Sequence, residues 1–212
     1  MRERMMRSVG GLVVLAVVGL IAPGGRLAAQ QAALTLEQPL PIDQAVKIGQ
    51  LPNGIKYFIR NNKRPANRVS MRLAVNVGSI DEENDQRGLA HFLEHMAFNG
   101  TENFKPGELV NFLESIGARF GPHVNAYTSF DETVYMLDVP TDRPGYVERG
   151  LTALHDFAAG MSLLPEEVDK ERGVVIEEWR GRLGAGSRLT EKQLPILLAN
   201  SRYAERLPIG TP

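Results

Sequence analysis

The stretch that decides the fold, residues 88–98, reads GLAHFLEHMAF and carries two histidines and a glutamate among apolar side chains. The apolar residues predict a largely buried helix over residues 86–98, which the following Asn-Gly pair ends. On a helix, His91 and His95 are four residues apart, so they lie on one face, one turn from each other. Glu94 follows His91 by three residues and lies near the same face.

This spacing suits a metal site, because two imidazoles one turn apart can reach one zinc ion at ~2.0–2.1 Å each. A carboxylate beside a metal-activated water can take its proton and pass it to a leaving amine, which makes Glu94 a candidate general base. The order H-x-x-E-H is a peptidase signature, the inverse of H-E-x-x-H. The alternative is a surface helix with solvated polar groups. The apolar neighbours argue against it, since buried His and Glu need partners.

A catalytic zinc usually has three protein ligands and one open position, so a third ligand must come from elsewhere in the chain. His155 lies among apolar residues of a predicted helix, which favours a core or boundary position. His123 lies in a loop-like Gly-Pro context and stays a candidate. Glu171 and Glu178 are better candidates: they are seven residues apart on a helix predicted over residues 165–182, so they share one face. An ordinary charged surface face is an equal alternative.

The remaining pattern mixes strands and helices without strict alternation. A half-buried strand is predicted over residues 55–60, after an Asn-Gly turn. A second strand with alternating apolar residues is predicted over 69–77, and residues 119–139 are predicted to form two strands joined near 129–131. Further helices are predicted from Pro106 to Gly117 and over residues 146–159. A glycine loop at 181–186 is followed by a last predicted helix over 189–199, which Pro195 should kink or split. We therefore expect an α+β fold, a mixed or antiparallel β-sheet packed with helices, with the zinc site on the H-x-x-E-H helix.

Composition narrows the function. The formal net charge is −1, so no strong field attracts nucleic acid, and we expect no nucleic-acid partner. The absence of cysteine excludes disulfides, thiolate metal sites and a cysteine nucleophile. Any metal must therefore be held by histidines and carboxylates.

The N-terminus has the layout of a secretory signal peptide over residues 1–29. A basic segment precedes a short apolar run, a Pro-Gly-Gly break and a small-residue cleavage site. The apolar run is short for a membrane span, although an uncleaved anchor is the alternative. We expect an exported protein, periplasmic or secreted, with a flexible lead-in over 30–45 and a zinc-binding domain over 46–212. The abrupt end suggests that this domain continues beyond residue 212.

Several ordered motifs together resemble the pitrilysin/insulinase family of zinc metallopeptidases, and the resemblance runs from about residue 48 to the end. The matching stretches are VGSID at 77–81, GLAHFLEHMAF at 88–98, NGT at 99–101, NAYT at 125–128 and ERGVVIEE at 171–178. The resemblance implies that His91 and His95 are zinc ligands and that Glu94 activates water. In the family, the ligand glutamate follows another functional glutamate by seven residues. This implies Glu178 as the third ligand and Glu171 in a supporting role.

The resemblance also implies how substrate binds. Family members take peptide as an extra strand on a sheet edge, and Asn125 and Ala126 match that edge, although alone they would be interpreted as plain turn-and-strand residues. Glu177 is the neighbour that could be confused with Glu178, but its side chain points about a quarter-turn away around the helix.

Family members also resemble two similar halves that close over the substrate. Since no second half is present in these 212 residues, we expect a fragment or a homologous partner chain.

The resulting hypothesis is a zinc metalloendopeptidase acting on peptide substrates with one Zn²⁺ per site. The alternative is a non-catalytic partner or binding subunit with the same fold. Inactive members of the family usually lose a metal ligand or the general base. Here the three ligand positions and the general base Glu94 are all retained, which favours an enzyme.

Overall fold

The computed structural model describes residues 41–212, so the predicted signal peptide and most of the predicted lead-in lie outside the described residues. The chain divides into two compact units, one ending at Ile59 and one from Arg60 to Pro212. In the described part of the chain, no helix is both long and apolar enough to cross a membrane.

The first unit contains a two-stranded hairpin of β1 (Val46–Gln50) and β2 (Lys56–Arg60). The predicted Asn-Gly turn is confirmed, since Gly54 has a φ of 94° and the N–H of Ile55 donates to Asn53 Oδ1 at 3.2 Å. The predicted half-burial of the second strand is wrong: all five residues of β2 are exposed. A two-stranded hairpin has no further layer of its own to cover its apolar side chains.

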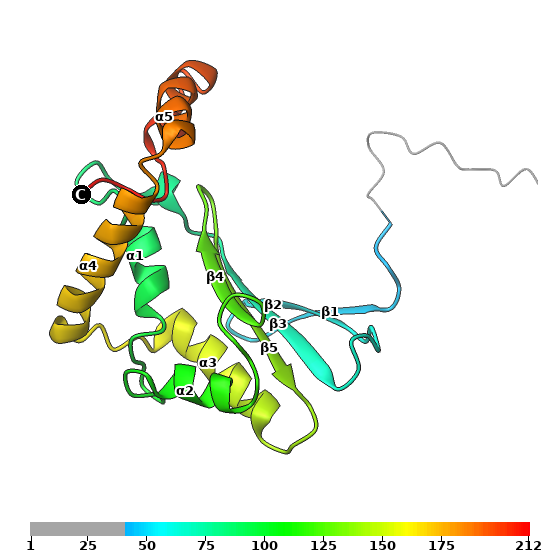
Figure 1. The fold of residues 1–212 in the computed structure, drawn as a ribbon. Coiled ribbons are helices and arrows are strands. Elements are labelled where there is room, and N and C mark those ends of the chain that lie inside the picture. Colours follow the sequence, from blue (N-terminus) through cyan, green and yellow to red (C-terminus); the bar gives the residue numbers. More distant parts are fainter. Residues whose placement is uncertain (1–40) are drawn as a thin grey trace, which may run out of the picture. The chain divides into compact units, whose positions relative to one another are not determined.

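The second unit is built on a three-stranded antiparallel sheet in the order β3-β5-β4 (Figure 1). Its strands are β3 (Arg68–Val75), β4 (Val124–Thr128) and β5 (Thr133–Pro140). In β3, buried and exposed residues alternate as the sequence predicts, so one face is available for helices. On the other face, Ser70 and Arg72 of β3 bond the carboxylate of Asp138 on β5.

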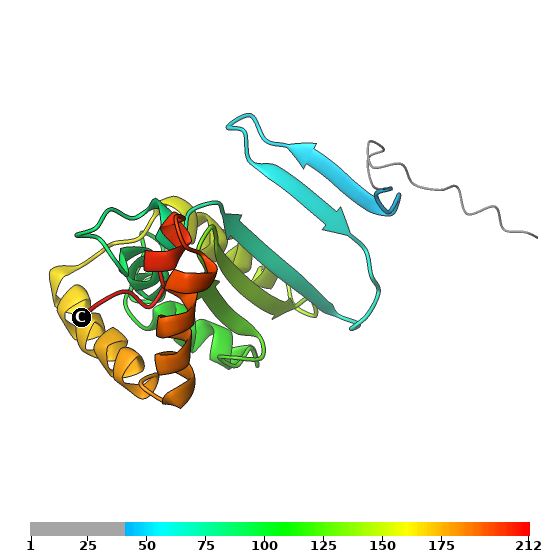
Figure 2. The same ribbon diagram turned by 90° about the horizontal axis from the view of Figure 1, so that it is seen from above.

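The helices of this unit that precede α4 are α1 (Leu89–Met96), α2 (Glu108–Ser115) and α3 (Tyr146–Ala159) (Figure 2). Leucines of α2 and apolar residues of α3 join the core cluster, and Met96 at the end of α1 is also buried. Tyr135 of β5 contacts both Phe98, just after α1, and Phe157 of α3, with ring centroids 6.5 and 4.9 Å apart. Gly150 lets α3 approach the sheet closely, because a Cβ there would lie 2.4 Å from Met71 Cε. The predicted bounds of α3 are confirmed, and the α+β prediction with them.

The chain then continues through α4 (Pro165–Gly181) and α5 (Ala185–Leu197) to a 3-10 turn over Arg202–Glu205. Helix α4 lies alongside α1, and α1 in turn contacts β4, so the zinc-motif helix is held between a strand and a helix (Figure 1). Of the two outcomes predicted for Pro195, a kink or a split, the split is wrong, because α5 continues through Pro195. Gly186 is helical rather than in a loop. Proline near a helix C-terminus removes only one of the last backbone hydrogen bonds.

Candidate metal centre

The zinc-motif helix α1 starts later than predicted, at Leu89, because Gly88 has a left-handed φ of 96° that no helix continues through. Its first free N–H groups are bonded by a remote side chain. The carboxylate of Glu82 accepts from the N–H of Gly88 at 2.9 Å and from that of Ala90 at 2.8 Å. A carboxylate at a helix N-terminus is favourable, and here it fixes the start of the helix that carries the histidines.

The segment that holds Glu82 is itself tied to the end of the chain. Arg206 is buried and donates from Nε to the backbone oxygen of Glu82 at 3.1 Å and from Nη2 to Asn84 Oδ1 at 2.8 Å. Ser79, fully buried, donates from Oγ to the backbone oxygen of Arg206 at 2.5 Å. Residues beyond position 200 therefore support the helix on which the predicted ligands lie.

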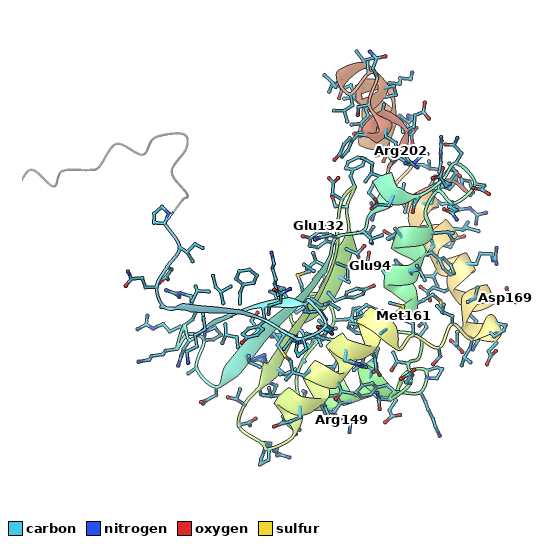
Figure 3. All side chains as sticks on the ribbon, turned by 180° about the vertical axis from the view of Figure 1, so that it is seen from behind. Glu94, Glu132, Arg149, Met161, Asp169 and Arg202 are labelled. Atoms are coloured by element: carbon cyan, nitrogen blue, oxygen red, sulfur yellow. The ribbon has the colours of Figure 1, made fainter. Side chains whose placement is uncertain are left out.

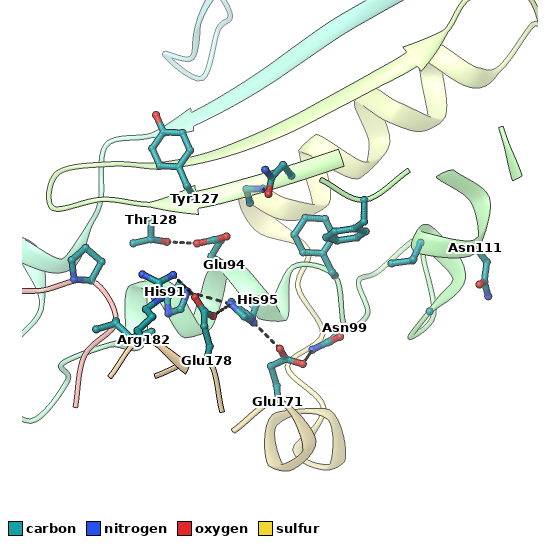
Figure 4. Close-up of a pocket in the computed structure, with 18 residues that line it drawn as sticks. His91, Glu94, His95, Asn99, Asn111, Tyr127, Thr128, Glu171, Glu178 and Arg182 are labelled. Carbon is teal, nitrogen blue, oxygen red and sulfur yellow. Dashed lines mark hydrogen bonds and ion pairs between the residues drawn. The ribbon is translucent and has the colours of Figure 1, made fainter. Parts of the chain in front are cut away.

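Three predicted residues converge between α1 and α4 (Figure 4). His91 Nε2 and His95 Nε2 are 3.2 Å apart. Glu178 Oε2, from α4, lies 3.5 Å from the first and 3.3 Å from the second. Its other oxygen is paired with Arg182, one turn further along the chain.

These distances fit a zinc ion. Tetrahedral ligands at ~2.0–2.1 Å from zinc are separated from each other by ~3.3–3.4 Å, close to the three distances here. When each neutral ring carries its proton on Nδ1 and the carboxylate is ionised, all three atoms present lone pairs to one another, and a cation among them offsets the repulsion. His91 favours the metal, because burial lowers the pKa of His91 and keeps the ring neutral, the form that ligates.

Glu94 lies beside this group but takes no part in it. Its side chain is buried and points from α1 toward the sheet (Figure 3), where Oε2 accepts from Thr128 Oγ1 at 2.8 Å. Burial raises the pKa of Glu94, and the hydrogen bond from Thr128 partly opposes this. A carboxylate with a raised pKa is a stronger proton acceptor, which suits a general base.

Glu171 lies on the other side of His95. Its Oε1 is 2.7 Å from His95 Nδ1, and its Oε2 accepts from Asn99 Nδ2 at 2.6 Å (Figure 4). The hydrogen bond to His95 lowers the pKa of Glu171, and the same bond raises the pKa of His95, so the two groups are a charge-assisted pair. Glu171 therefore orients the ring rather than joining the cluster of three atoms.

A cleft of about 690 Å³ contains all of these side chains. The predicted substrate residues Asn125 and Ala126 line it from strand β4. Phe98 and Phe120, whose ring centroids are 5.1 Å apart, form an apolar part of the wall. The cleft therefore combines a polar cluster with a strand edge and an apolar surface.

Other candidates do not join the cluster. His123 Nδ1 accepts from the backbone N–H of Arg119 at 3.3 Å and does not line the cleft. The core or boundary position predicted for His155 is wrong, since 69% of its side chain is exposed while its neighbour Asp156 is fully buried. Glu177 is exposed and pairs with Arg180.

Sequence reasoning assigned no role to several residues that contact the cluster. Thr128 belongs to the NAYT motif and Asn99 to the NGT motif. The motifs therefore pointed to both residues but did not indicate which side chains they bond. Arg182 offered no signal beyond its position one turn after Glu178. Pro208 and Ile209, which line the cleft from the end of the chain, could not be connected with it from sequence.

The sequence of this chain is similar to those of known proteases. Residues 57–195 match the insulinase family, peptidase family M16. The zinc protease PQQL-like protein of Arabidopsis thaliana is 46% identical over 162 residues, which are 76% of this chain and 17% of that protein. The probable zinc protease PqqL of Escherichia coli is 39% identical over 208 residues, 98% of this chain and 21% of that protein. The chain thus spans about a fifth of the length of these relatives.

Solved structures show the same fold. The crystal structure of the first half of the periplasmic protease PqqL from Escherichia coli has a TM-score of 0.77 and 41% identity, covering 81% of this chain and 37% of that chain. At this level of identity the likeness extends to sequence as well as to fold.

Proposed function

Because the chain belongs to the insulinase family of peptidases, we propose that it carries the catalytic zinc site of a metalloendopeptidase, with Glu94 as general base. The observation that carries the proposal is the convergence of His91 Nε2, His95 Nε2 and Glu178 Oε2 at 3.2–3.5 Å from one another. The fit of these three distances to a tetrahedral zinc supports it.

In this proposal, His91, His95 and Glu178 hold the ion. Bound zinc polarises the peptide carbonyl as a Lewis acid and lowers the pKa of water. Glu171 holds the ring of His95 through Nδ1, which leaves Nε2 free as a ligand. Arg182 occupies the second oxygen of Glu178, so only Oε2 is turned toward the two rings.

Glu94 moves the proton. Its carboxylate takes a proton from the attacking water and passes it to the leaving amine, and its raised pKa suits both steps. Thr128 Oγ1 holds one carboxylate oxygen, which restricts rotation of the side chain. Glu94 therefore remains in place without being a ligand itself.

Peptide substrate is proposed to bind along β4, the edge strand of the three-stranded sheet that lines the cleft. Hydrogen-bonded pairs alternate in an antiparallel ladder, and the N–H of Asp138 donates to the oxygen of His123. Asn125 therefore turns its N–H and C=O toward β5, whereas Ala126 turns its own outward. In the structure, the outward N–H of Ala126 is bonded by Asn125 Oδ1 at 3.0 Å, a bond that a peptide carbonyl can replace.

This gives a test of strand addition. Ala126→Pro removes only the outward N–H, and proline is tolerated at such edge positions. We expect kcat/KM for an unstructured peptide to fall ~2- to 10-fold, mainly through KM, because one main-chain hydrogen bond is lost. Zinc content and thermal stability should stay unchanged.

The matched variant is Asn125→Pro, which removes an N–H that faces β5. It should lower thermal stability, because a ladder hydrogen bond is broken. If Ala126→Pro cleaves peptide with wild-type kcat/KM, substrate does not use this edge.

The proposed function itself is tested by metal removal. The whole protein should hydrolyse an unstructured fluorogenic peptide, lose that activity on treatment with a zinc chelator, and regain it when zinc is restored. Folded protein that binds zinc but cleaves no peptide would favour the non-catalytic subunit instead.

The wider setting is proposed by analogy with the relatives. Since this chain spans about a fifth of their length, we propose that a homologous second half, in the same chain or a partner chain, completes the substrate chamber. The structure neighbour is described as the first half of a periplasmic protease, which also supports a periplasmic location.

A further inference from the structure

Asn99 is the residue where the loop after the zinc-motif helix α1 meets α4. Its side-chain amide donates from Nδ2 to Glu171 Oε2 at 2.6 Å (Figure 4). Glu171 has 14% of its side chain exposed, so little water is available to replace this donor. Asn99 is therefore the hydrogen-bond donor to Glu171 Oε2, the oxygen of this carboxylate that does not face His95.

The two hydrogen bonds of Glu171 act together. Oε1 is 2.7 Å from His95 Nδ1, and Oε2 is held by Asn99, so the carboxylate is restrained at both oxygens. A carboxylate accepts and does not donate, so Nδ1 of His95 carries the proton in this pair. When the ring is neutral, this tautomer leaves the lone pair on His95 Nε2, the atom that faces His91 and Glu178.

The backbone gives no reason for asparagine at position 99. The helix ends through hydrogen bonds of the Phe98 and Asn99 N–H groups to His95 and Met96 oxygens, which any residue can make. The left-handed conformation that stops the chain belongs to Gly100, with a φ of 116°, and Asn99 does not share it. Asn99 Nδ2 also lies 3.9 Å from Met96 Sδ, a weak acceptor, so the 2.6 Å bond to the Glu171 carboxylate is the stronger reason for an amide here.

The loop that carries Asn99 is anchored independently of the cluster. The fully buried carboxylate of Asp156 accepts from Thr101 Oγ1 at 2.6 Å and from Asn103 Nδ2 at 2.8 Å. The backbone oxygen of Gly100 accepts from Ser162 at 3.0 Å, close to Met161, where the chain leaves α3 for α4 (Figure 3). Asn99 thus presents its amide from a fixed support.

We propose that Asn99 is a positioning residue of the zinc site: it holds Glu171 in the rotamer that orients His95. The inference rests on the proposed function, because it assigns a consequence for zinc binding. In this role Asn99 acts through Glu171, whose Oε2 accepts from its side-chain amide.

A double-mutant cycle on zinc affinity tests this in the whole protein. Four proteins are compared by competition with a fluorescent zinc chelator: wild type, Asn99→Ala, Glu171→Gln and the double variant. Glu171→Gln should weaken zinc binding ~10- to 100-fold, as loss of a residue that orients a ligand does. Asn99→Ala should weaken it ~3- to 10-fold, because one charge-assisted hydrogen bond is lost. In the double variant, Asn99→Ala should add almost nothing.

Asn103→Ala is the matched control, an asparagine of the same loop that bonds Asp156 instead of Glu171. It should lower thermal stability, and any effect on zinc should be the same with and without Glu171→Gln. The proposal is overturned if Asn99→Ala leaves zinc affinity unchanged, or weakens it by the same factor in both backgrounds. If the wild-type protein itself binds no zinc, the result contradicts the proposed function rather than the role of Asn99.

Discussion

Glu94→Gln is expected to lower kcat by ~10²- to 10⁴-fold while the protein keeps its zinc. The amide has the shape of the carboxylate and can still accept from Thr128 Oγ1, which lies 2.8 Å from Glu94 Oε2. It cannot take a proton at neutral pH, so water activation fails. Because Glu94 lies outside the cluster of three converging atoms, the metal site itself should be untouched.

The measurement pairs steady-state peptide cleavage with zinc content for the same preparation. Glu102→Gln, an exposed glutamate outside the cleft, is the matched control and should behave as wild type. A Glu94→Gln protein that cleaves peptide at the wild-type rate would remove Glu94 as the base. One that loses its zinc would make Glu94 part of the metal site.

Most of the correct predictions of helices, strands and the histidine pair came from the local periodicity of the sequence. His91 and His95 come together because helical geometry places residues four apart on one face, which needs no knowledge of the fold. The bounds of α3 and the alternation in β3 followed from the same kind of pattern. Glu178 was different: spacing made it one candidate among several, and only the family resemblance singled it out.

The supporting contacts could not be predicted because they join distant parts of the chain. Asn99 and Glu171 are 72 positions apart, and Thr128 and Glu94 are 34 apart. Glu82 was part of an acidic loop in sequence, yet it bonds the start of α1. Such pairings depend on how the elements pack, and composition or periodicity contains no information about that.

Glu178→Gln has the second large expected effect. Its Oε2 is 3.5 Å from His91 Nε2 and 3.3 Å from His95 Nε2, so removing its charge leaves two neutral rings to hold a divalent cation. We expect zinc affinity to fall by at least ~100-fold, more than for a residue that only orients a ligand. Glu177→Gln is the matched control on the same helix, since Glu177 is exposed and pairs with Arg180.

Zinc content by elemental analysis of wild type, Glu178→Gln and Glu177→Gln tests the central claim most directly. The three-ligand site predicts about one zinc per chain in wild type and Glu177→Gln, and little or none in Glu178→Gln after dialysis against a weak chelator. Equal zinc in all three folded proteins, or its loss in Glu177→Gln instead, would contradict the assignment of Glu178 as the third ligand.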